Sequence, residues 1–566
     1  MTTMNDTPQR HETNSLGETN SLSETNSLGE TPSLFAANVY LMLGLFVLVW
    51  SSYAFQDVGV RYVVGIVVLA ALAVGALLFL RLERLAARDT LRWRWPGWRM
   101  VGLSAALAPG LWMLGVMLNL ITTAILGYTT PLPPTMFPRN AIEALLLLVA
   151  TVVAAPLFEE IIFRGYIQRA YERRTPWTGI TAVGVIFALY HLRFQGALAL
   201  IPVALTLGFV VWRTGSLFPG IALHAAYNSI ASIVLIASTF LPMAAASGVL
   251  LALVCLGFFM VPATAALLYL IWRWNAPPVH AALPKPAGWR AWAWIAPLVL
   301  MGGIYGYAAY AEILVGRFPE RLAEAELALQ TPAAWEAPAR WRYVIQGGLN
   351  QTVGEAACDL APQPDSVTLT CRINLEAFEA ALPFKLPEHF EGITLPGFSL
   401  AGAAFESMEH IIWARTDLSV QAMEGTRESE TARLTLTHAA SENGAMLRVE
   451  SNGQTQTTNL PSGVFLDGEW PWRLSALPFN LAYGSTQQLA LVNRQGGIEV
   501  VDAFIVVAGS EPAWTPAGNF VTWKVTVTYT LDDQETTLRA WYDVDAPHTL
   551  VRYDNGEVNF LLEKVE

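Results

Sequence analysis

The chain has 566 residues, of which 53% are hydrophobic and only 14% are charged, and its formal net charge is −12. Because soluble proteins usually carry about 25% charged residues, this composition excludes an ordinary soluble protein. Residues 1–315 hold 18 basic and 13 acidic residues and residues 316–566 hold 16 and 33, which indicates a membrane-embedded half and a soluble, acidic half. The basic residues border apolar runs and form no patch with stacking aromatics, so no nucleic-acid partner is expected.

Residues 1–34 contain a polar repeat, "ETNSLG ETNSLS ETNSLG ETPSL". The repeat has no periodic apolar positions, which predicts a disordered tail. It also lacks the basic start, apolar core and cleavage site of a secretory signal. The apolar segment that begins at Phe35 is therefore expected to act as an uncleaved anchor.

Nine apolar segments follow and predict an all-α bundle that crosses the membrane about nine times over residues 35–315. A straight helix needs about 20 apolar residues to span a bilayer, and two of the nine segments are shorter. The segments are 35–55, 58–80, 100–126, 141–163, 177–192, 197–212, 215–241, 244–272 and 291–315, of which 177–192 and 197–212 are the short ones.

The distribution of basic residues predicts the orientation of this bundle in a cell membrane. With the N-terminus in the cytoplasm, the inner segments hold 14 of the 18 basic residues, and the outer loops hold only Arg139 and Arg193. Basic loops face the cytoplasm, so this asymmetry favours an N-terminus inside. Nine crossings then predict that the C-terminal domain is extracytoplasmic.

The segment "EEIIFR" places two carboxylates at the end of an apolar run. Neighbouring residues on a helix diverge by about 100°, so Glu159 and Glu160 face different ways. Glu160 and Arg164 are spaced i, i+4 with the acid first, which favours an ion pair on one face. Glu159 is then left to point into a cavity as a proton acceptor. The alternative is that all three simply mark the end of a membrane span.

Two further apolar runs carry polar residues that support the first interpretation. "VIFALYHL" contains His191, and "PGIALHAAYNSI" places His224 and Asn228 on one helix face. A single histidine in an apolar helix is usually a packing residue, but ionisable groups that converge inside a membrane are functional by default. A carboxylate and a histidine can hold and polarise a water, and a second histidine with an amide can stabilise an oxyanion. These groups are sufficient to hydrolyse an amide.

The segments "EEIIFR", "FALYH" and "HAAYN" resemble the ordered signatures E-E-x-x-x-R, F-x-x-x-H and H-x-x-x-N/D of the CPBP family. This family comprises CAAX prenyl endopeptidases of the Ras-converting type and bacterial relatives implicated in bacteriocin processing and immunity. The resemblance covers about residues 140–240 and implies an intramembrane peptidase with a membrane-embedded or lipidated protein or peptide as substrate. By this resemblance, the catalytic residues would be Glu159, which activates water, His191, which helps to bind it, and His224 with Asn228, which form the oxyanion site, with Glu160 and Arg164 in support.

The sequence leaves a metal-dependent alternative open. Glu159, His191 and His224 are the three residues that could form a zinc site. A mechanism without a cofactor is preferred because no two of these ligands lie one turn apart on a single helix.

Helix geometry raises one difficulty for this interpretation. Glu159 would lie about 27 Å along a straight helix from Ile142, and His191 about 21 Å from Trp177 on a helix of opposite sense. These lengths place the two residues at different depths. A broken, tilted or re-entrant segment near 177–196 would remove the difference, and it could also alter the crossing count.

The second half is predicted to be a helical stalk, 316–340, followed by an antiparallel β-rich domain, 341–566. Stretches such as "VTWKVTVTYTL" alternate β-branched or aromatic residues with polar ones, which predicts strands with one buried face. A curved sheet or an open barrel is expected. Cys358 and Cys371 are the only cysteines in this half, and in an oxidising compartment they could form a disulfide.

The sequence thus favours an intramembrane endopeptidase with a β domain that could bind a substrate or a partner protein. One alternative is a proton- or ion-coupled transporter that uses the same carboxylates and histidines, although the repeated halves typical of transporters are not visible. The other is an inactive scaffold that binds peptides through the same cavity.

Overall fold

The computed structural model describes two compact units, one built mainly from helices and one mainly from strands. In the first half the structure describes residues 31–54, 61–130, 136–241, 243–275 and 293–317. In the second half it describes 329–566 except for 332, 348–350, 377, 380–400, 403, 430–432, 442–443, 452–453, 462, 481–482, 493–497 and 532–533. The predicted tail, apart from its last residues, and residues 318–328 and 332 of the predicted stalk lie outside the described residues. The described part of the stalk is not one helix, because α15 ends at Arg317, a 3-10 turn covers Ala333–Glu336 and strand β1 begins at Ala339.

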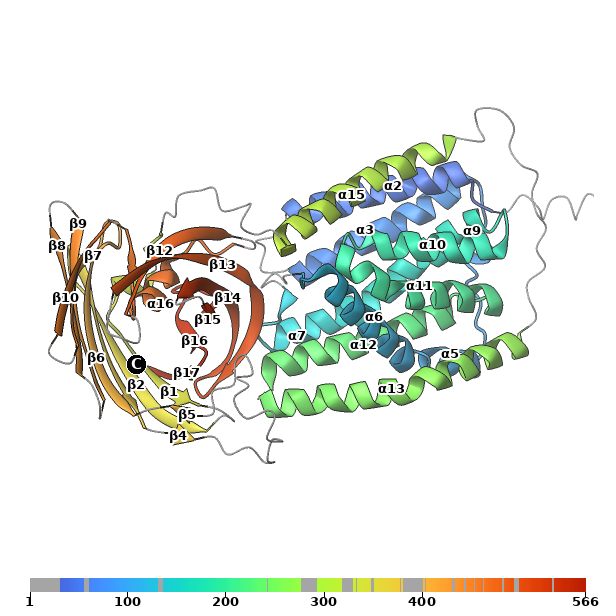
Figure 1. Cartoon of the computed structure of the whole chain (residues 1–566). Helices are drawn as coiled ribbons and strands as arrows, with labels where there is room; N and C mark the ends of the chain where they lie inside the picture. Colours follow the sequence, from blue (N-terminus) through green and yellow to red (C-terminus); the bar gives the residue numbers. More distant parts are fainter. Residues whose placement is uncertain are drawn as a thin grey trace, which may run out of the picture. The chain divides into compact units, whose positions relative to one another are not determined.

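Eight helical runs in the described part are long and apolar enough to cross a membrane (Figure 1). Nine crossings were predicted, and the difference is the helix α10, Pro176–Tyr190, whose 15 residues are fewer than a full span needs. The eight runs are α2 (Leu34–Ala54), α3 (Arg61–Leu82), α5 with α6 (Trp98–Ala105, Ala108–Leu126), α7 to α9 (141–171), α11 (Phe194–Thr214), α12 (Phe218–Phe240), α13 (Met243–Trp274) and α15 (Ile295–Arg317); the short helix α4 (Ala87–Thr90) lies between α3 and α5.

Helices α10 and α11 form an antiparallel hairpin. The ring of Trp177, at the start of α10, lies 6.1 Å from that of Trp212 near the end of α11. Further along, a Cβ on Gly184 would lie only 2.8 Å from a methyl carbon of Leu205. The absence of a side chain at Gly184 therefore lets the two helices approach closely midway along the hairpin.

The run from residue 141 to 171 is not a regular α-helix. It consists of α7 (Ala141–Leu148), α8 (Ala155–Glu160) and α9 (Gln168–Tyr171), separated by two π-helical segments, η2 (Val149–Ala154) and η3 (Ile161–Ile167). Such wide turns are rare and are frequent at functional sites. The two of them flank the glutamate pair at the end of α8.

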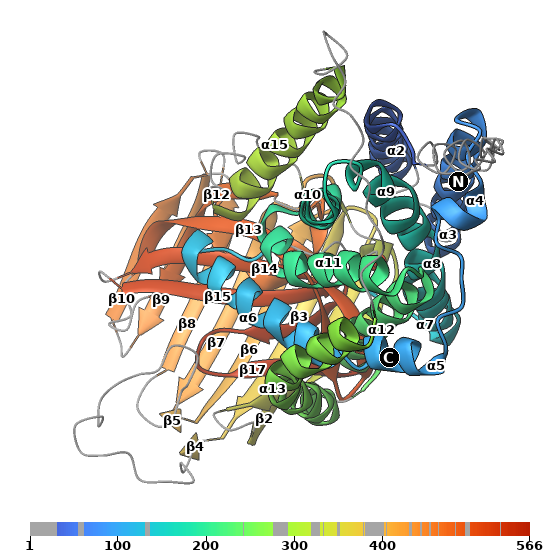
Figure 2. The same ribbon diagram turned by 90° about the vertical axis from the view of Figure 1, so that its right-hand side faces the viewer.

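The strands form one 15-stranded sheet in the order β10-β9-β8-β7-β6-β3-β2-β1-β17-β16-β15-β14-β13-β12-β11, and a small sheet pairs β4 with β5. Neighbouring strands are antiparallel, except that β11 and β12 are parallel. Figure 1 shows the long sheet curling around the short helix α16, Trp470–Arg473, and Figure 2 shows the strands of the sheet after a turn of 90°. The expected curved antiparallel sheet is therefore present. The strands are β1 (Ala339–Gln346), β2 (Thr352–Pro362), β3 (Ser366–Leu375), β4 (Phe378–Glu379), β5 (Ala401–Gly402), β6 (Phe405–Ala414), β7 (Val420–Ser429), β8 (Arg433–Ser441), β9 (Gly444–Ser451), β10 (Gln454–Leu460), β11 (Phe465–Leu466), β12 (Gly484–Val492), β13 (Ile498–Thr515), β14 (Gly518–Leu531), β15 (Gln534–Asp543), β16 (Leu550–Asp554) and β17 (Asn559–Val565).

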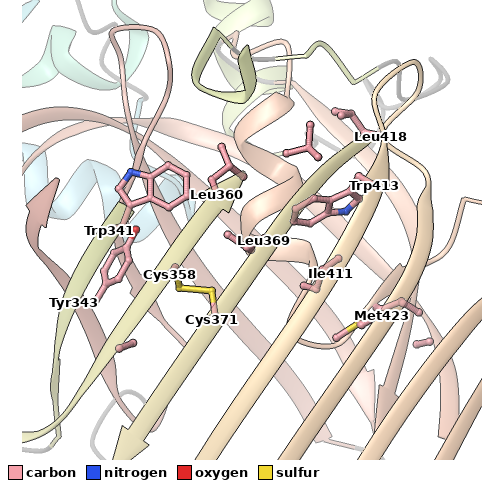
Figure 3. Close-up of a cluster of buried hydrophobic side chains, with 14 of the residues drawn as sticks. Trp341, Tyr343, Cys358, Leu360, Leu369, Cys371, Ile411, Trp413, Leu418 and Met423 are labelled. Carbon is pink, nitrogen blue, oxygen red and sulfur yellow. A yellow bond between two sulfur atoms is a disulfide. The ribbon is translucent and has the colours of Figure 1, made fainter. Parts of the chain in front are cut away.

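The inner face of the curved sheet carries the core of the β domain. Trp341, Leu360, Leu369 and Trp413 from four different strands gather on this face (Figure 3). The predicted disulfide between Cys358 and Cys371 is present there, joining directly opposite residues of β2 and β3. It ties together two central strands of the sheet.

Candidate active site

The predicted ion pair between Glu160 and Arg164 is present and completely buried. Arg164 Nη1 lies 2.8 Å from Glu160 Oε1, and Arg164 Nη2 donates to the carbonyl of Ala204 on α11 at 3.1 Å. The guanidinium also lies 4.3 Å from the centre of the Phe187 ring. Because a buried charge is tolerated only when it is paired and hydrogen-bonded, these contacts explain how both charges remain inside the bundle.

His224 on α12 completes this network. Its Nδ1 lies 3.0 Å from Glu160 Oε1, the same oxygen that binds Arg164. An ionised carboxylate can only accept hydrogen bonds, so the proton of this bond is assigned to His224 Nδ1. The other ring nitrogen, Nε2, then lies 3.9 Å from Oε2 of Glu159.

The close approach of α12 to Glu160 depends on Gly220. A Cβ at this position would lie 3.1 Å from Glu160 Oε2 and 2.5 Å from a methyl carbon of Val211. A larger residue would push the start of α12 away from the ion pair. His224, one turn further along, would move with it.

Glu159 differs from Glu160 in both surroundings and exposure. Its side chain is 18% exposed, whereas that of Glu160 is fully buried. The distance of 3.9 Å from Glu159 Oε2 to His224 Nε2 is too long for a direct hydrogen bond. Polar atoms at such a separation are suited to sharing a bridging water, so the two residues can hold a water between a carboxylate and an imidazole.

The side chain of Asn228 donates a hydrogen bond to a main-chain carbonyl that has no main-chain donor in the π-helical segment η2. The amide of Ala155 donates to the carbonyl of Ala150, five residues back, instead of to Thr151. The next residue, Pro156, has no N–H to offer. The carbonyl of Thr151 therefore accepts from the Asn228 side chain at 2.8 Å. One amide hydrogen of Asn228 is used in this bond, and the amide carries a second.

His191 lies at the end of α10 beside the same aromatic residue as Arg164. Its Nδ1 is 2.9 Å from the carbonyl of Phe187, and its ring is 4.9 Å from the Phe187 ring. The Phe187 ring is also 5.8 Å from that of His224. Phe187 therefore packs between the two histidines and the buried arginine.

The length of the run 141–171 resolves the predicted difference in depth, because this run continues past the predicted end at residue 163 to Tyr171. Both α9 and α10 meet at the loop after Tyr171, and Glu159 lies about 18 Å from that end by helix rise. The 15 residues of α10 place His191 about 22 Å from the same end.

The three residues of the zinc alternative do not form a metal site. Within the described part of the chain, no group of three or more His, Cys, Asp and Glu side chains is placed to hold a metal ion. The Nδ1 atoms of both histidines are bound by Glu160 and by the carbonyl of Phe187, which leaves Nε2 on each ring to face the site. The chemistry is derived below from the protein groups alone.

Two contributors to the site were not predicted, Thr151 and Ser232. The hydroxyl of Thr151 lies 2.8 Å from that of Ser232, one turn after Asn228 on α12. Thr151 also donates to the carbonyl of Leu147. A sequence signal exists for Ser232, which repeats the i, i+4 spacing of His224 and Asn228. Thr151 has no such signal, because its carbonyl is left open only by the π-helical register of η2.

Comparison with known proteins agrees with this geometry. Residues 141–230 match the family model "Type II CAAX prenyl endopeptidase Rce1-like". No curated protein matches the chain. One solved structure, a Bacteroides fragilis protein with a YmcC-like fold, is similar to it at 7% identity and a TM-score of 0.15, covering 43% of this chain and all of the other. At that TM-score the likeness carries no argument.

The helical half therefore combines eight runs that are long and apolar enough to cross a membrane with a domain that matches the CAAX prenyl endopeptidase family model. That domain is Rce1-like and occupies residues 141–230, which include Glu159, Glu160, Arg164, His191, His224 and Asn228.

Proposed function

We propose that the chain is an intramembrane endopeptidase that hydrolyses a peptide bond of a membrane-associated protein or peptide with a water activated by Glu159. The observation that carries this proposal is the 3.9 Å gap between Glu159 Oε2 and His224 Nε2. His224 is held rigidly on the other side of its ring by Glu160 and Arg164. Such preorganisation is what a general base and its partner require.

In this mechanism Glu159 removes a proton from the water as the oxygen attacks the substrate carbonyl, and returns it to the leaving amine. His224, with Nδ1–H bound to Glu160, presents the lone pair of Nε2 to the same water when the ring is neutral. His191 is placed in the same way, because Nδ1 faces the carbonyl of Phe187. The water has two hydrogens, so Glu159 takes one of them and the second is available to Nε2 of one neutral histidine, His224 or His191.

Stabilisation of the oxyanion requires donors, and two are available. Asn228 carries a second amide hydrogen besides the one bound to Thr151. His224 Nε2 faces the same space as Glu159 and would donate as the second group in a ring that carries both protons. The tetrahedral intermediate would thus meet donors on α12 and a base on α8.

The topology of the chain supports a cytoplasmic N-terminus with the site reached from the cytoplasmic half of the bilayer. Glu159 lies about 18 Å from the Tyr171 end of its helix, the end that is followed by Arg173 and Arg174. Basic residues favour the cytoplasmic face. The β domain would then bind a substrate or a partner protein on the opposite face.

The test is cleavage of a broad library of membrane peptides by the purified protein in lipid, with products identified by mass spectrometry. Glu159→Gln is expected to lower the cleavage rate roughly a hundredfold or more, the usual contribution of a general base, with little change in melting temperature. Glu160→Gln should lower both the rate and the melting temperature, because it breaks a buried ion pair.

Retention of full cleavage by the Glu159→Gln variant would overturn the assignment of the base. Absence of cleavage by every form, together with a pH-dependent ion flux in the same vesicles, would favour the transporter instead.

A further inference from the structure

The curved sheet encloses a cavity of about 350 Å³. One wall is the inner face of strands β1–β3, β6, β12 and β14–β17, and the other is the segment Asp467–Trp472, which leads into and through most of α16. Ligand sites usually measure about 300–1,000 Å³ and combine apolar walls with a few polar groups. The cavity has this size and this construction, and it lies entirely within the β domain.

Aromatic rings form much of the wall. Trp472 packs against Tyr343 with ring centres 5.8 Å apart, and Tyr553 packs against Phe560 at 5.7 Å. The hydroxyl of Tyr343 is already bonded to the carbonyl of Leu550. Tyr343 therefore adds ring surface to the cavity, since its hydroxyl is engaged elsewhere.

The polar part of the wall is negative. Glu409, Asp467 and Glu557 contribute carboxylates, and none of the lining residues, all of which the structure describes, is a lysine or an arginine. Burial, and after it the charge of Asp467, raises the pKa of Tyr529 to about 12.

The segment that closes the cavity is shaped to bring these carboxylates together. Gly468 has a φ of +85°, a conformation that side chains rarely adopt. A Cβ there would lie only 2.8 Å from both carboxylate oxygens of Glu409. Glycine at this position therefore allows Asp467 and Glu409 to line the same space.

From this arrangement we propose that the cavity of the β domain binds a small organic cation with an apolar or aromatic body, such as a quaternary ammonium or a protonated amine. Aromatic faces attract such cations through the ring quadrupole, and carboxylates complement their charge. An anion would be repelled, and the carboxylates form no cluster that could hold a metal ion in the described part of the chain. The excess of 33 acidic over 16 basic residues in residues 316–566 also raises the local concentration of cations.

The experiment uses the full chain in lipid nanodiscs and measures binding by calorimetry and by tryptophan fluorescence. The probe is benzyltrimethylammonium, and benzenesulfonate is the anionic comparison of similar size. The cation is expected to bind and to change the fluorescence, whereas the sulfonate should do neither. Asp467→Asn should weaken binding of the cation about tenfold, the loss expected for one partly desolvated charge contact. Glu557→Gln should weaken it by a smaller factor, because Glu557 is exposed to solvent.

Asp365→Asn provides the matched control, because Asp365 is an exposed carboxylate of the same domain outside the cavity, and it should leave binding unchanged. Glu557 is also exposed, so its substitution tests the cavity without endangering the fold. Equal binding of cation and sulfonate, no binding of the cation, or unchanged binding in both cavity variants would each overturn the proposal. None of these outcomes depends on whether the helical half cleaves peptides.

Discussion

At the scale of single residues, the buried pair of Glu160 and Arg164 dominates the site. The two charges stabilise each other, while His224 also binds Glu160 and the carbonyl of Ala204 also accepts from Arg164. Arg164→Gln is therefore expected to destabilise the protein by about 3–5 kcal/mol, since it leaves Glu160 as an uncompensated buried charge. Adding Glu160→Gln to this variant should restore part of the loss, because the double change removes both charges.

Thermal unfolding in detergent, followed by circular dichroism, measures this effect. Arg94→Gln is the matched control, because its ion pair with Asp89 leaves both side chains more than half exposed and is worth about 1 kcal/mol or less. A single variant at Arg164 as stable as the control, or a double variant less stable than the sum of the two changes, would contradict this account.

A second buried carboxylate, Glu469 in the β domain, predicts a dependence of stability on pH. Burial raises its pKa from the ordinary value of 4.5, although Arg473, Trp413 and the amide of Leu466 oppose the shift. Because the folded state holds the proton more tightly, this residue stabilises the fold most at pH values below 4.5, and the contribution is lost as the pH rises through the raised pKa.

The melting temperature of the β domain, followed in the full chain by near-ultraviolet circular dichroism, should therefore fall as the pH rises from 4.5 through the raised pKa of Glu469. This fall should be absent in the variant Glu469→Gln, whose amide oxygen can still accept the hydrogen bond from the indole of Trp413. An identical pH profile for wild type and variant would contradict the prediction.

At the scale of elements, the π-helical segment η2 explains why Asn228 is held where it is. The Thr151 carbonyl lacks a main-chain donor because Ala155 binds Ala150 and Pro156 has no N–H. Asn228→Leu should therefore cost roughly 1–3 kcal/mol, the penalty for an unsatisfied buried carbonyl. Adding Pro156→Ala supplies an N–H at the position that a π-helical turn would use, so the double variant should recover stability.

The readout is again the melting temperature, with Pro156→Ala alone as the reference. The double variant is expected to recover stability without recovering peptide cleavage. The second amide hydrogen of Asn228 is absent from Asn228→Leu both with and without Pro156→Ala. If Pro156→Ala does not lessen the effect of Asn228→Leu, the proline is not the reason that Asn228 binds Thr151.

The sequence predicted the elements well where local chemistry determines them. The long apolar runs, the i, i+4 pair of Glu160 and Arg164, and the alternating strands each follow from a pattern within a few residues. The disulfide could also be predicted, because Cys358 and Cys371 are the only two cysteines in the second half of the sequence.

Other features depend on contacts between distant segments and leave little local trace. The π-helical segments around α8 keep the apolar character of an ordinary helix, so periodicity does not reveal them. His224 binds Glu160 across 64 residues of sequence, and no spacing rule indicates which of the two histidines would lie beside Glu159. The order of the 15 strands likewise depends on long-range pairing, such as that of β1 with β17.

At the scale of the whole molecule, the hairpin of α10 and α11 affects the number of membrane crossings, and this number decides on which side of the membrane the C-terminal domain lies. The two helices are antiparallel, so the chain returns after α11 to the face from which α10 started. If α10 crosses the bilayer completely, α11 crosses back and the pair adds two crossings. If α10 turns back within the bilayer, α11 starts there as well and the pair adds none, even though α11 alone has the length of a span. The side reached by the C-terminal domain is therefore unaffected by the shortness of α10.

This parity predicts an extracytoplasmic β domain if the N-terminus is cytoplasmic, and the disulfide of that domain fits an oxidising compartment. A protease added to intact cells should remove an epitope tag placed after Glu566 and leave a tag placed before Met1. Membrane permeabilisation should expose both tags, which controls for tags that are hidden by the fold. In the same cells, Cys358 and Cys371 should resist alkylation until a reductant is added. A C-terminal tag that is cleaved only after permeabilisation would show instead that the chain crosses the membrane an even number of times, and would move the β domain to the side of the basic loops.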